Sequence, residues 1–76
     1  MKNVIHQYYR KKVETDLILI QINPHTLEGV EILVSGSKYL KKTQRHFDAD
    51  IYDDLDVDGF EPSNALEFNV YLSELV

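Results

Sequence analysis

Residues 47–61 read FDADIYDDLDVDGFE, and this stretch decides how we expect the rest of the chain to fold. Phe47, Ile51 and Leu55 recur at intervals of four residues, so they share one side of an α-helix. The carboxylate of Asp48 is suited to accept hydrogen bonds from the free N–H groups of the first helical turn. The stretch therefore predicts a short amphipathic helix that begins at this aspartate and turns an apolar stripe toward the core.

The predicted end of this helix combines a favourable backbone signal with unfavourable charge. Gly59 suits the left-handed conformation in which many helices end, and Phe60 after it would pack on Leu55, as in a Schellman motif. Acidic side chains near a helix C-terminus lie at the negative end of the helix dipole, which costs about 0.3 kcal/mol for each of them. The acidic residues concerned are Asp53, Asp54, Asp56 and Asp58.

The charges of the chain are divided between its two parts. Residues 1–46 carry all eight Lys and Arg with four acidic side chains, a sum of +4, whereas residues 47–76 carry nine acidic side chains and no Lys or Arg, a sum of −9. Two arrangements fit this division: basic strands next to the acidic helix, or a dipolar surface with two partners. We favour the first, because surface charges of opposite sign gain from proximity at little cost. A cation, the chain's own Lys41, Lys42 and Arg45, or a basic partner would relieve the repulsion at the end of the helix.

The composition is that of one small globular domain, residues 1–76. The chain is 43% hydrophobic and 28% charged, which is too apolar for intrinsic disorder. The absence of cysteine excludes disulfides, thiol catalysis and cysteine metal sites. The longest apolar run, residues 17–20, is too short to span a bilayer, and no signal peptide is recognisable near the N-terminus. We therefore expect a soluble cytoplasmic protein without membrane contact.

Four segments before the acidic stretch predict the strands of an antiparallel sheet. Residues 17–22, LILIQI, are almost continuously apolar and β-branched, which is typical of a buried central strand. Residues 30–34 alternate well enough to form its partner. Residues 4–13 fit a helix or a strand, and we favour a strand because Val, Ile and Tyr have high β propensity. Residues 39–47 carry few apolar side chains, and their lysines are typical of an edge strand.

The last segment, residues 64–76, has two interpretations. Asn64 and Glu67 form a capping box of the N-x-x-E type, which favours a helix. Phe68 and Val70 alternate with polar neighbours, as they would in a fifth strand. We favour the helix. The predicted fold class is therefore α+β, an antiparallel four-stranded β-meander followed by one or two C-terminal helices packed on one face, with the fifth strand as the alternative for the last segment.

Residues 54–59, DLDVDG, match the first half of a calcium-binding loop. The alternate carboxylates of Asp54, Asp56 and Asp58 are hard oxygen ligands, and the glycine allows a sharp bend. The second half of the loop is missing, because Ala65 stands where the bidentate glutamate is needed. A helix through the same residues would also keep the carboxylates apart. We favour a solvated acidic helix end over a Ca²⁺ site, and we expect no other cofactor.

Basic and aromatic side chains on the predicted strands suggest nucleic-acid binding as an alternative function. Lysine and arginine would contact phosphates, and tyrosine would stack on bases. The nine acidic side chains of the second part would repel the same backbone, and no RNP-type aromatic motif is present. Nucleic acid is therefore the less favoured partner. The residues that would bind it are Tyr8, Arg10, Lys12, Tyr39, Lys41 and Arg45.

The favoured function is protein–protein interaction. No catalytic arrangement is recognisable in the sequence, and a domain of this size has little volume for a substrate cleft, so we expect a protein that is not an enzyme. The acidic helix surface, residues 48–61, would bind a basic protein or a second copy of the chain. The residues predicted to form this surface are Asp50, Asp53, Asp54, Asp56, Asp58 and Glu61.

Overall fold

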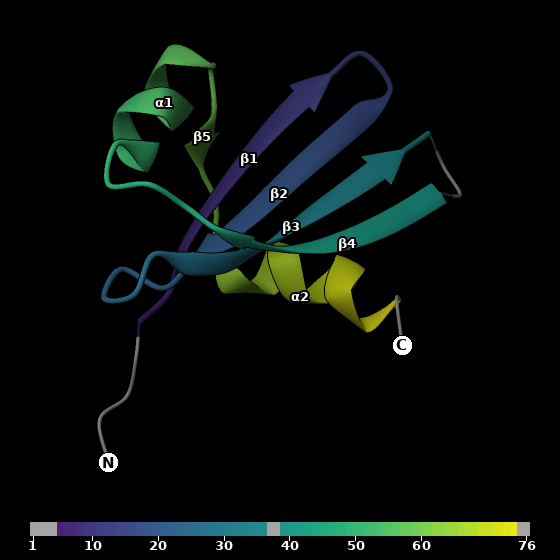
Figure 1. Cartoon of the computed structure of the whole chain (residues 1–76). Helices are drawn as coiled ribbons and strands as arrows, with labels where there is room; N and C mark the ends of the chain where they lie inside the picture. The colour runs from purple at the N-terminus through teal and green to yellow at the C-terminus, as the bar shows by residue number, and fades with distance from the viewer. Residues whose placement is uncertain (1–4, 37–38, 75–76) are drawn as a thin grey trace.

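The computed structural model describes residues 5–36 and 39–74, which form one five-stranded sheet and two helices (Figure 1). Neighbouring strands are antiparallel, and their order across the sheet is β4-β3-β2-β1-β5. The first four strands form a meander. The strands are β1 (Gln7–Val13), β2 (Asp16–Ile22), β3 (Glu28–Ser35), β4 (Tyr39–His46) and β5 (Glu61–Pro62), and the helices are α1 (Ile51–Val57) and α2 (Ala65–Ser73).

The α+β prediction is confirmed, with its four-stranded meander and its C-terminal helix. The strand favoured for residues 4–13 is β1, although residue 4 lies outside the described residues. The last segment is the helix α2, and residues 75 and 76 lie outside the described part. The fifth strand is instead β5, which pairs with Tyr9 and Arg10 of β1 and was not predicted. Its proline is tolerated because β5 lies at the sheet edge.

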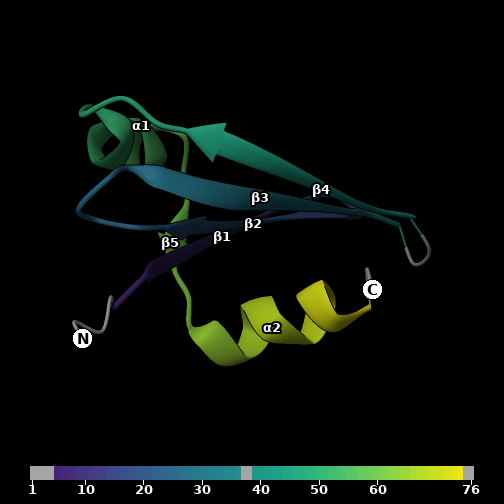
Figure 2. The same cartoon turned by 60° about the horizontal axis from the view of Figure 1, so that its bottom comes forward.

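The two helices lie on opposite faces of the sheet (Figure 2). Helix α2 covers one face, whereas α1 covers part of the other, so the expected packing of the helices on a single face holds for α2 alone. The nearly unbroken apolar sequence of β2 follows from this arrangement, because a strand covered on both faces has no solvent-facing side. The buried cluster on the α2 face consists of Leu17, Leu19, Ile32 and Phe68, and the cluster on the α1 face consists of Ile20, Ile22, Phe47 and Leu55.

Helix α1 ends in the Schellman motif that the sequence predicts. Gly59 has a φ of +87°, and its N–H donates to the carbonyl of Asp56 at 3.1 Å. The N–H of Phe60 donates to the carbonyl of Leu55 at 2.9 Å, and the Phe60 ring packs against the cluster that contains Leu55. These contacts fix the direction in which the chain leaves α1 toward β5.

The predicted start of α1 is wrong. The N-cap residue is Asp50, whose side chain accepts no capping hydrogen bond, and Asp48 lies before a turn that precedes the helix. The physical reason is a competing backbone contact. The N–H of Ile51 donates to the main-chain carbonyl of Asp48 at 3.0 Å, so the backbone closes this turn and the Asp48 carboxylate is not required. The side chain of Asp48 is exposed.

Gly29 of β3 lies where a side chain does not fit. A β-carbon at this position would overlap the backbone oxygen of Gln21 and would approach the ring of Phe47 to 2.9 Å. Phe47 is 6% exposed and belongs to the cluster under α1. The missing side chain at Gly29 therefore allows the residue before α1 to reach the sheet.

We predict that Gly29→Ala destabilises the protein by about 2 kcal/mol, because the added methyl group must displace the backbone at Gln21 and crowds the Phe47 ring. Gly36→Ala is the control. It meets no neighbouring atom within 4 Å and only strains a residue with a φ of +63°, so we expect a loss of about 1 kcal/mol. Urea unfolding measures both. A Gly29→Ala protein as stable as the wild type would contradict the packing described here.

Candidate functional site: the acidic surface of α1

The acidic residues predicted to bind a partner lie on α1 and immediately around it. Asp53, Asp54 and Asp56 belong to the helix, and Asp50 and Asp58 are its N-cap and C-cap residues. All five side chains are exposed. The sixth predicted residue, Glu61, follows on β5 and is also exposed. The structure therefore brings the five predicted aspartates together around one short helix. Glu61 lies apart from them, because it is the register partner of Arg10 and its side chain pairs with Arg10 on the α2 face.

An exposed apolar side chain lies within this acidic surface. With about 100° of rotation per helical residue, Asp53, Asp54 and Val57 share the side of α1 that faces away from Leu55. Val57 is 84% exposed, whereas Leu55 is 4% exposed in the core. The helix thus holds the sheet with one side and presents a valine with acidic neighbours on the other. Sequence reasoning missed the exposure of Val57, although its position opposite the apolar stripe signalled it.

Tyr52 joins α1 to the first strand. Its ring centroid lies 6.3 Å from that of Tyr9, and both residues pack against the α1-face cluster. Burial raises the pKa of Tyr9 above its usual value, and the neighbouring Tyr52 raises it further, so the Tyr9 phenol stays neutral at physiological pH. The hydroxyl of Tyr52 is buried and has no hydrogen-bond partner among the described residues. This pair therefore anchors α1 by packing.

The two parts of opposite charge meet after the helix and not along it. Arg10 of β1 pairs with Glu61 and Glu67, whereas no aspartate of α1 forms an ion pair among the described residues. Among residues 5–36 and 39–74, the remaining ion pair joins Arg45 to Glu31. Lys41 and Lys42 form no ion pair within the same residues. The reason is topological: Lys42 shares the α2 face with its register partner Ile32, and Lys41 lies far along β4 from the strand end that leads into α1.

A lysine that was not predicted lies beside the end of α1. The ammonium group of Lys11 on β1 is 5.8 Å from the ring centroid of Phe60, a cation–π contact. Its side chain also approaches Gly59, where a β-carbon would lie 4.0 Å from the Lys11 Cε atom. This positive charge is favourable next to the negative end of the helix dipole. No local sequence signal links β1 to the end of α1, because the contact depends on the sheet register.

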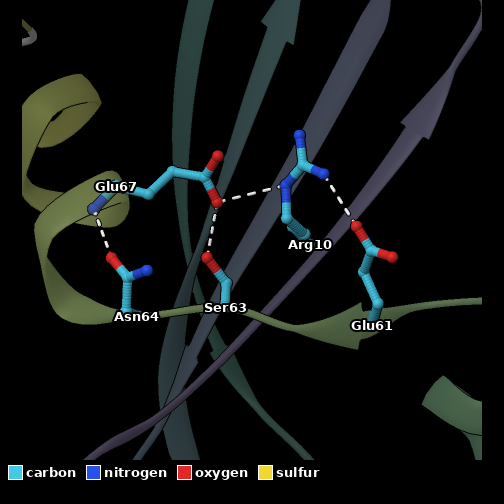
Figure 3. Close-up of polar contacts among 5 residues, drawn as sticks. All are labelled: Arg10, Glu61, Ser63, Asn64 and Glu67. Carbon is cyan, nitrogen blue, oxygen red and sulfur yellow. Dashed lines mark hydrogen bonds and ion pairs between the residues drawn. The ribbon is translucent and has the colours of Figure 1, made fainter.

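Arg10 ties β1 to the segment between the two helices (Figure 3). Its guanidinium donates to Glu61 Oε1 at 2.7 Å, and its Nε lies 3.1 Å from Glu67 Oε1. The hydroxyl of Ser63 donates to the same Glu67 oxygen, and the N–H of Glu67 donates to Asn64 Oδ1 at 2.9 Å, which caps α2. The hydrogen bond to Glu61 and the charge of Glu67 raise the pKa of Arg10. Arg10 therefore has a structural role.

We predict that Arg10→Gln lowers the free energy of unfolding by about 1 kcal/mol, because it breaks the contacts with both glutamates on a partly exposed surface. Lys12→Gln is the matched control, since Lys12 lies on the same strand and face, is exposed and makes no ion pair among the described residues. We expect a change of less than about 0.5 kcal/mol for the control. Equal losses in chemical denaturation would show that Arg10 does not anchor β5 and α2.

The residues of the nucleic-acid alternative are divided between the two faces of the sheet. Tyr8, Arg10 and Lys12 point to the α2 face, whereas Lys41 and Arg45 point to the α1 face. Tyr39 pairs with Ser35 in the backbone register, and its side chain is outside the described part. Three of these residues have intramolecular partners: Arg10 and Arg45 in the ion pairs described above, and Tyr8, whose hydroxyl accepts from Gln21 Nε2 at 3.1 Å. Nucleic-acid binding stays a prediction that no contact favours.

The three aspartates of the calcium-loop match are wound into the helix and its cap. Asp54 and Asp56 are two positions apart on α1, so their side chains point to nearly opposite sides of the helix. Within residues 5–36 and 39–74, no three His, Cys, Asp or Glu side chains are grouped so that they could hold a metal ion. Calcium binding at Asp54, Asp56 and Asp58 stays a prediction, which the melting temperature of the protein with and without calcium can test.

We expect the melting temperature to differ by less than about 1 °C between millimolar CaCl₂ and EDTA, because a ligand stabilises a fold only when it binds the native state. Differential scanning fluorimetry at constant ionic strength measures this difference, with MgCl₂ as the matched salt. A rise of several degrees that is specific to calcium and is lost in Asp54→Asn would establish a site that the helical geometry does not indicate.

A shallow hollow of about 410 Å³ lies at the opposite end of the α2 face from the β1–β2 turn. The side chains of Glu28, Gln44, Arg45 and His46 around it are exposed. The amide oxygen of Asn23 is already used, because it accepts from the N–H groups of His25 and Thr26. We find no arrangement of nucleophile and base at this hollow among the described residues. The full lining consists of His6, Gln21, Asn23, Thr26, Glu28, Gly29, Val30, Gln44, Arg45 and His46.

Comparison of the chain with protein families, with curated proteins and with solved structures finds no match. Within the described residues, neither helix has the length and the apolar character needed to cross a lipid bilayer.

Proposed function

We propose that this protein is a non-enzymatic protein–protein interaction module that binds a basic partner through the acidic surface of α1. The observation that carries the proposal is the 84% exposure of Val57 beside the exposed carboxylates of Asp53 and Asp54. A protein interface typically combines an apolar centre with a polar rim. An isolated exposed valine is ordinary, but here it stands on the outward side of a helix and is bordered by one sign of charge.

Electrostatics support a basic partner. Asp50, Asp53, Asp54, Asp56 and Asp58 form no ion pair with the described residues, and several of them lie near the negative end of α1. Each aspartate in the last turns costs about 0.3 kcal/mol, and lysine or arginine side chains of a partner would offset this cost. The concentrated negative potential would also speed the encounter with a basic protein.

The acidic surface is held in place before a partner arrives. Leu55 is buried in the sheet-side cluster, Tyr52 packs on Tyr9, and the Schellman contacts fix Gly59 and Phe60. A surface on a fixed element loses little conformational freedom on binding. We also propose a cytoplasmic location, which the absence of cysteine supports.

Photo-crosslinking tests the proposed function. Benzoylphenylalanine in place of Val57 should form adducts in cells that express the protein, and mass spectrometry should map them to a lysine- or arginine-rich surface of a protein. The same substitution at Asn69, an exposed position on the outward side of α2, is the matched control and should give few adducts. This control shows whether benzoylphenylalanine at any exposed helical position forms adducts with other proteins.

The charge dependence decides the outcome. The additional changes Asp53→Asn and Asp54→Asn should reduce the adducts from position 57 at least about tenfold, because they remove rim charges that face the partner. Equal labelling from positions 57 and 69 would contradict the proposal. Labelling from position 57 that is unchanged by the two substitutions, or that maps to an acidic surface, would contradict it as well.

A further inference from the structure

The α1 face of the sheet is covered by a helix at one end only. Helix α1 packs over Ile20 and Ile22, in the half of β2 that is remote from the β1–β2 turn. Nearer to that turn, Ile18 and Leu33 are register partners on the same face, and both are half-buried. Ile18 also packs against the α1-face cluster. Val13, at the end of β1 on the same face, is 42% exposed. Figure 2 shows that the sheet beyond α1 carries no helix on this side.

Lysines flank this apolar pair. The register places Lys11 of β1 opposite Ile18 and Lys41 of β4 opposite Leu33, so one row across four strands reads Lys11, Ile18, Leu33, Lys41. We call these four residues the open row. The acidic side chains of the adjacent rows have partners of their own: Asp16 accepts a hydrogen bond from Ser35 at 3.1 Å, and Glu31 pairs with Arg45 at 2.8 Å.

The open row and the outer side of α1 are complementary in composition. The row has an apolar centre with a lysine at each end, and α1 presents exposed Val57 with Asp53 and Asp54 beside it. Lys41 is exposed, whereas Lys11 is half-buried and also lies over the Phe60 ring of its own subunit. The two surfaces lie on the same face of the sheet, one raised by the thickness of a helix and the other at the level of the strands (Figure 2). A second copy of the chain can be placed against this face by a two-fold rotation whose axis is parallel to the sheet and perpendicular to the strands. The raised helix of each copy then lies over the lower part of the other.

We propose that the occupant of the open row is α1 of a second copy of this chain, in a two-fold symmetric dimer that joins the α1 faces of both subunits. Each α1 then lies on the open row of the other subunit, and both contacts are identical. Val57 packs against Ile18 and Leu33, and the aspartates face Lys11 and Lys41. This inference rests on the proposed function, because it assigns a partner to the same acidic surface.

Charge exchange between two variants tests the dimer. Lys11→Glu with Lys41→Glu makes the row acidic, and Asp53→Lys with Asp54→Lys makes the helix basic. Each double variant alone should raise the dimer dissociation constant at least about tenfold, because both of its symmetric contacts join like charges. An equimolar mixture should form a dimer again, since in the mixed pair each helix faces a row of opposite sign. Sedimentation velocity at low salt measures all three samples.

Matched controls carry the same charge changes on the other face. Lys12→Glu with Lys42→Glu, and Glu28→Lys with Glu74→Lys, alter exposed residues on the α2 side and should leave the dissociation constant within about twofold of the wild type. Val57→Ser is a further variant without a charge change. It alters an 84% exposed side chain, so the fold is kept while the dimer weakens. Circular dichroism checks the fold of every variant.

The outcomes separate this inference from the proposed function. A wild-type protein that stays monomeric up to about 1 mM would overturn the dimer. So would a dimer that neither double variant weakens, or a mixture that does not restore it. If the protein is monomeric and position 57 still crosslinks to a basic surface of a different protein, only the dimer fails. If neither association occurs, both fail.

Discussion

The structure depends on the burial of β2 from both faces of the sheet. Alternate residues of this strand point to opposite sides, so Leu17 and Leu19 pack under α2 while Ile20 and Ile22 pack under α1. A domain of 76 residues has little apolar surface to distribute. Because β2 lies in the middle, one strand contributes to both clusters. Each helix then needs only one buried side chain, Phe68 or Leu55, with partly buried neighbours such as Tyr52 beside it.

Because α1 needs only one side to pack on the sheet, its outer side is available for contact with a partner. Only Leu55 of this helix is buried, and the chain before and after it is tied down by Phe47 against Gly29 and by the Schellman contacts. The exposed aspartates then cost little stability, because surface charges contribute weakly to folding. They can be retained for recognition, and with Val57 among them they form the surface that we propose for contact.

The sequence predicted what local patterns determine. The apolar run of β2, the edge character of β4, the glycine end of α1 and the Asn64 cap of α2 each follow from neighbouring residues. Contacts that depend on register were missed: β5, the pairing of Arg10 with Glu61 and Glu67, and Lys11 beside Phe60. The acidic surface was predictable from composition. The absence of ion pairs at its aspartates among the described residues, and the lysine-flanked open row on the same face, could be recognised only from the topology.

Amide chemical shifts measured against protein concentration test the central claim most directly, which is that the outer side of α1 and the open row make the contacts of this protein. Between about 10 μM and 1 mM, NMR spectra of ¹⁵N-labelled protein should change at Asp53 and Val57 on α1 and at Ile18 and Leu33 in the sheet, while α2 stays unchanged. Changes confined to Leu66 and Val70 on the outward side of α2, or no change at any residue, would contradict the account.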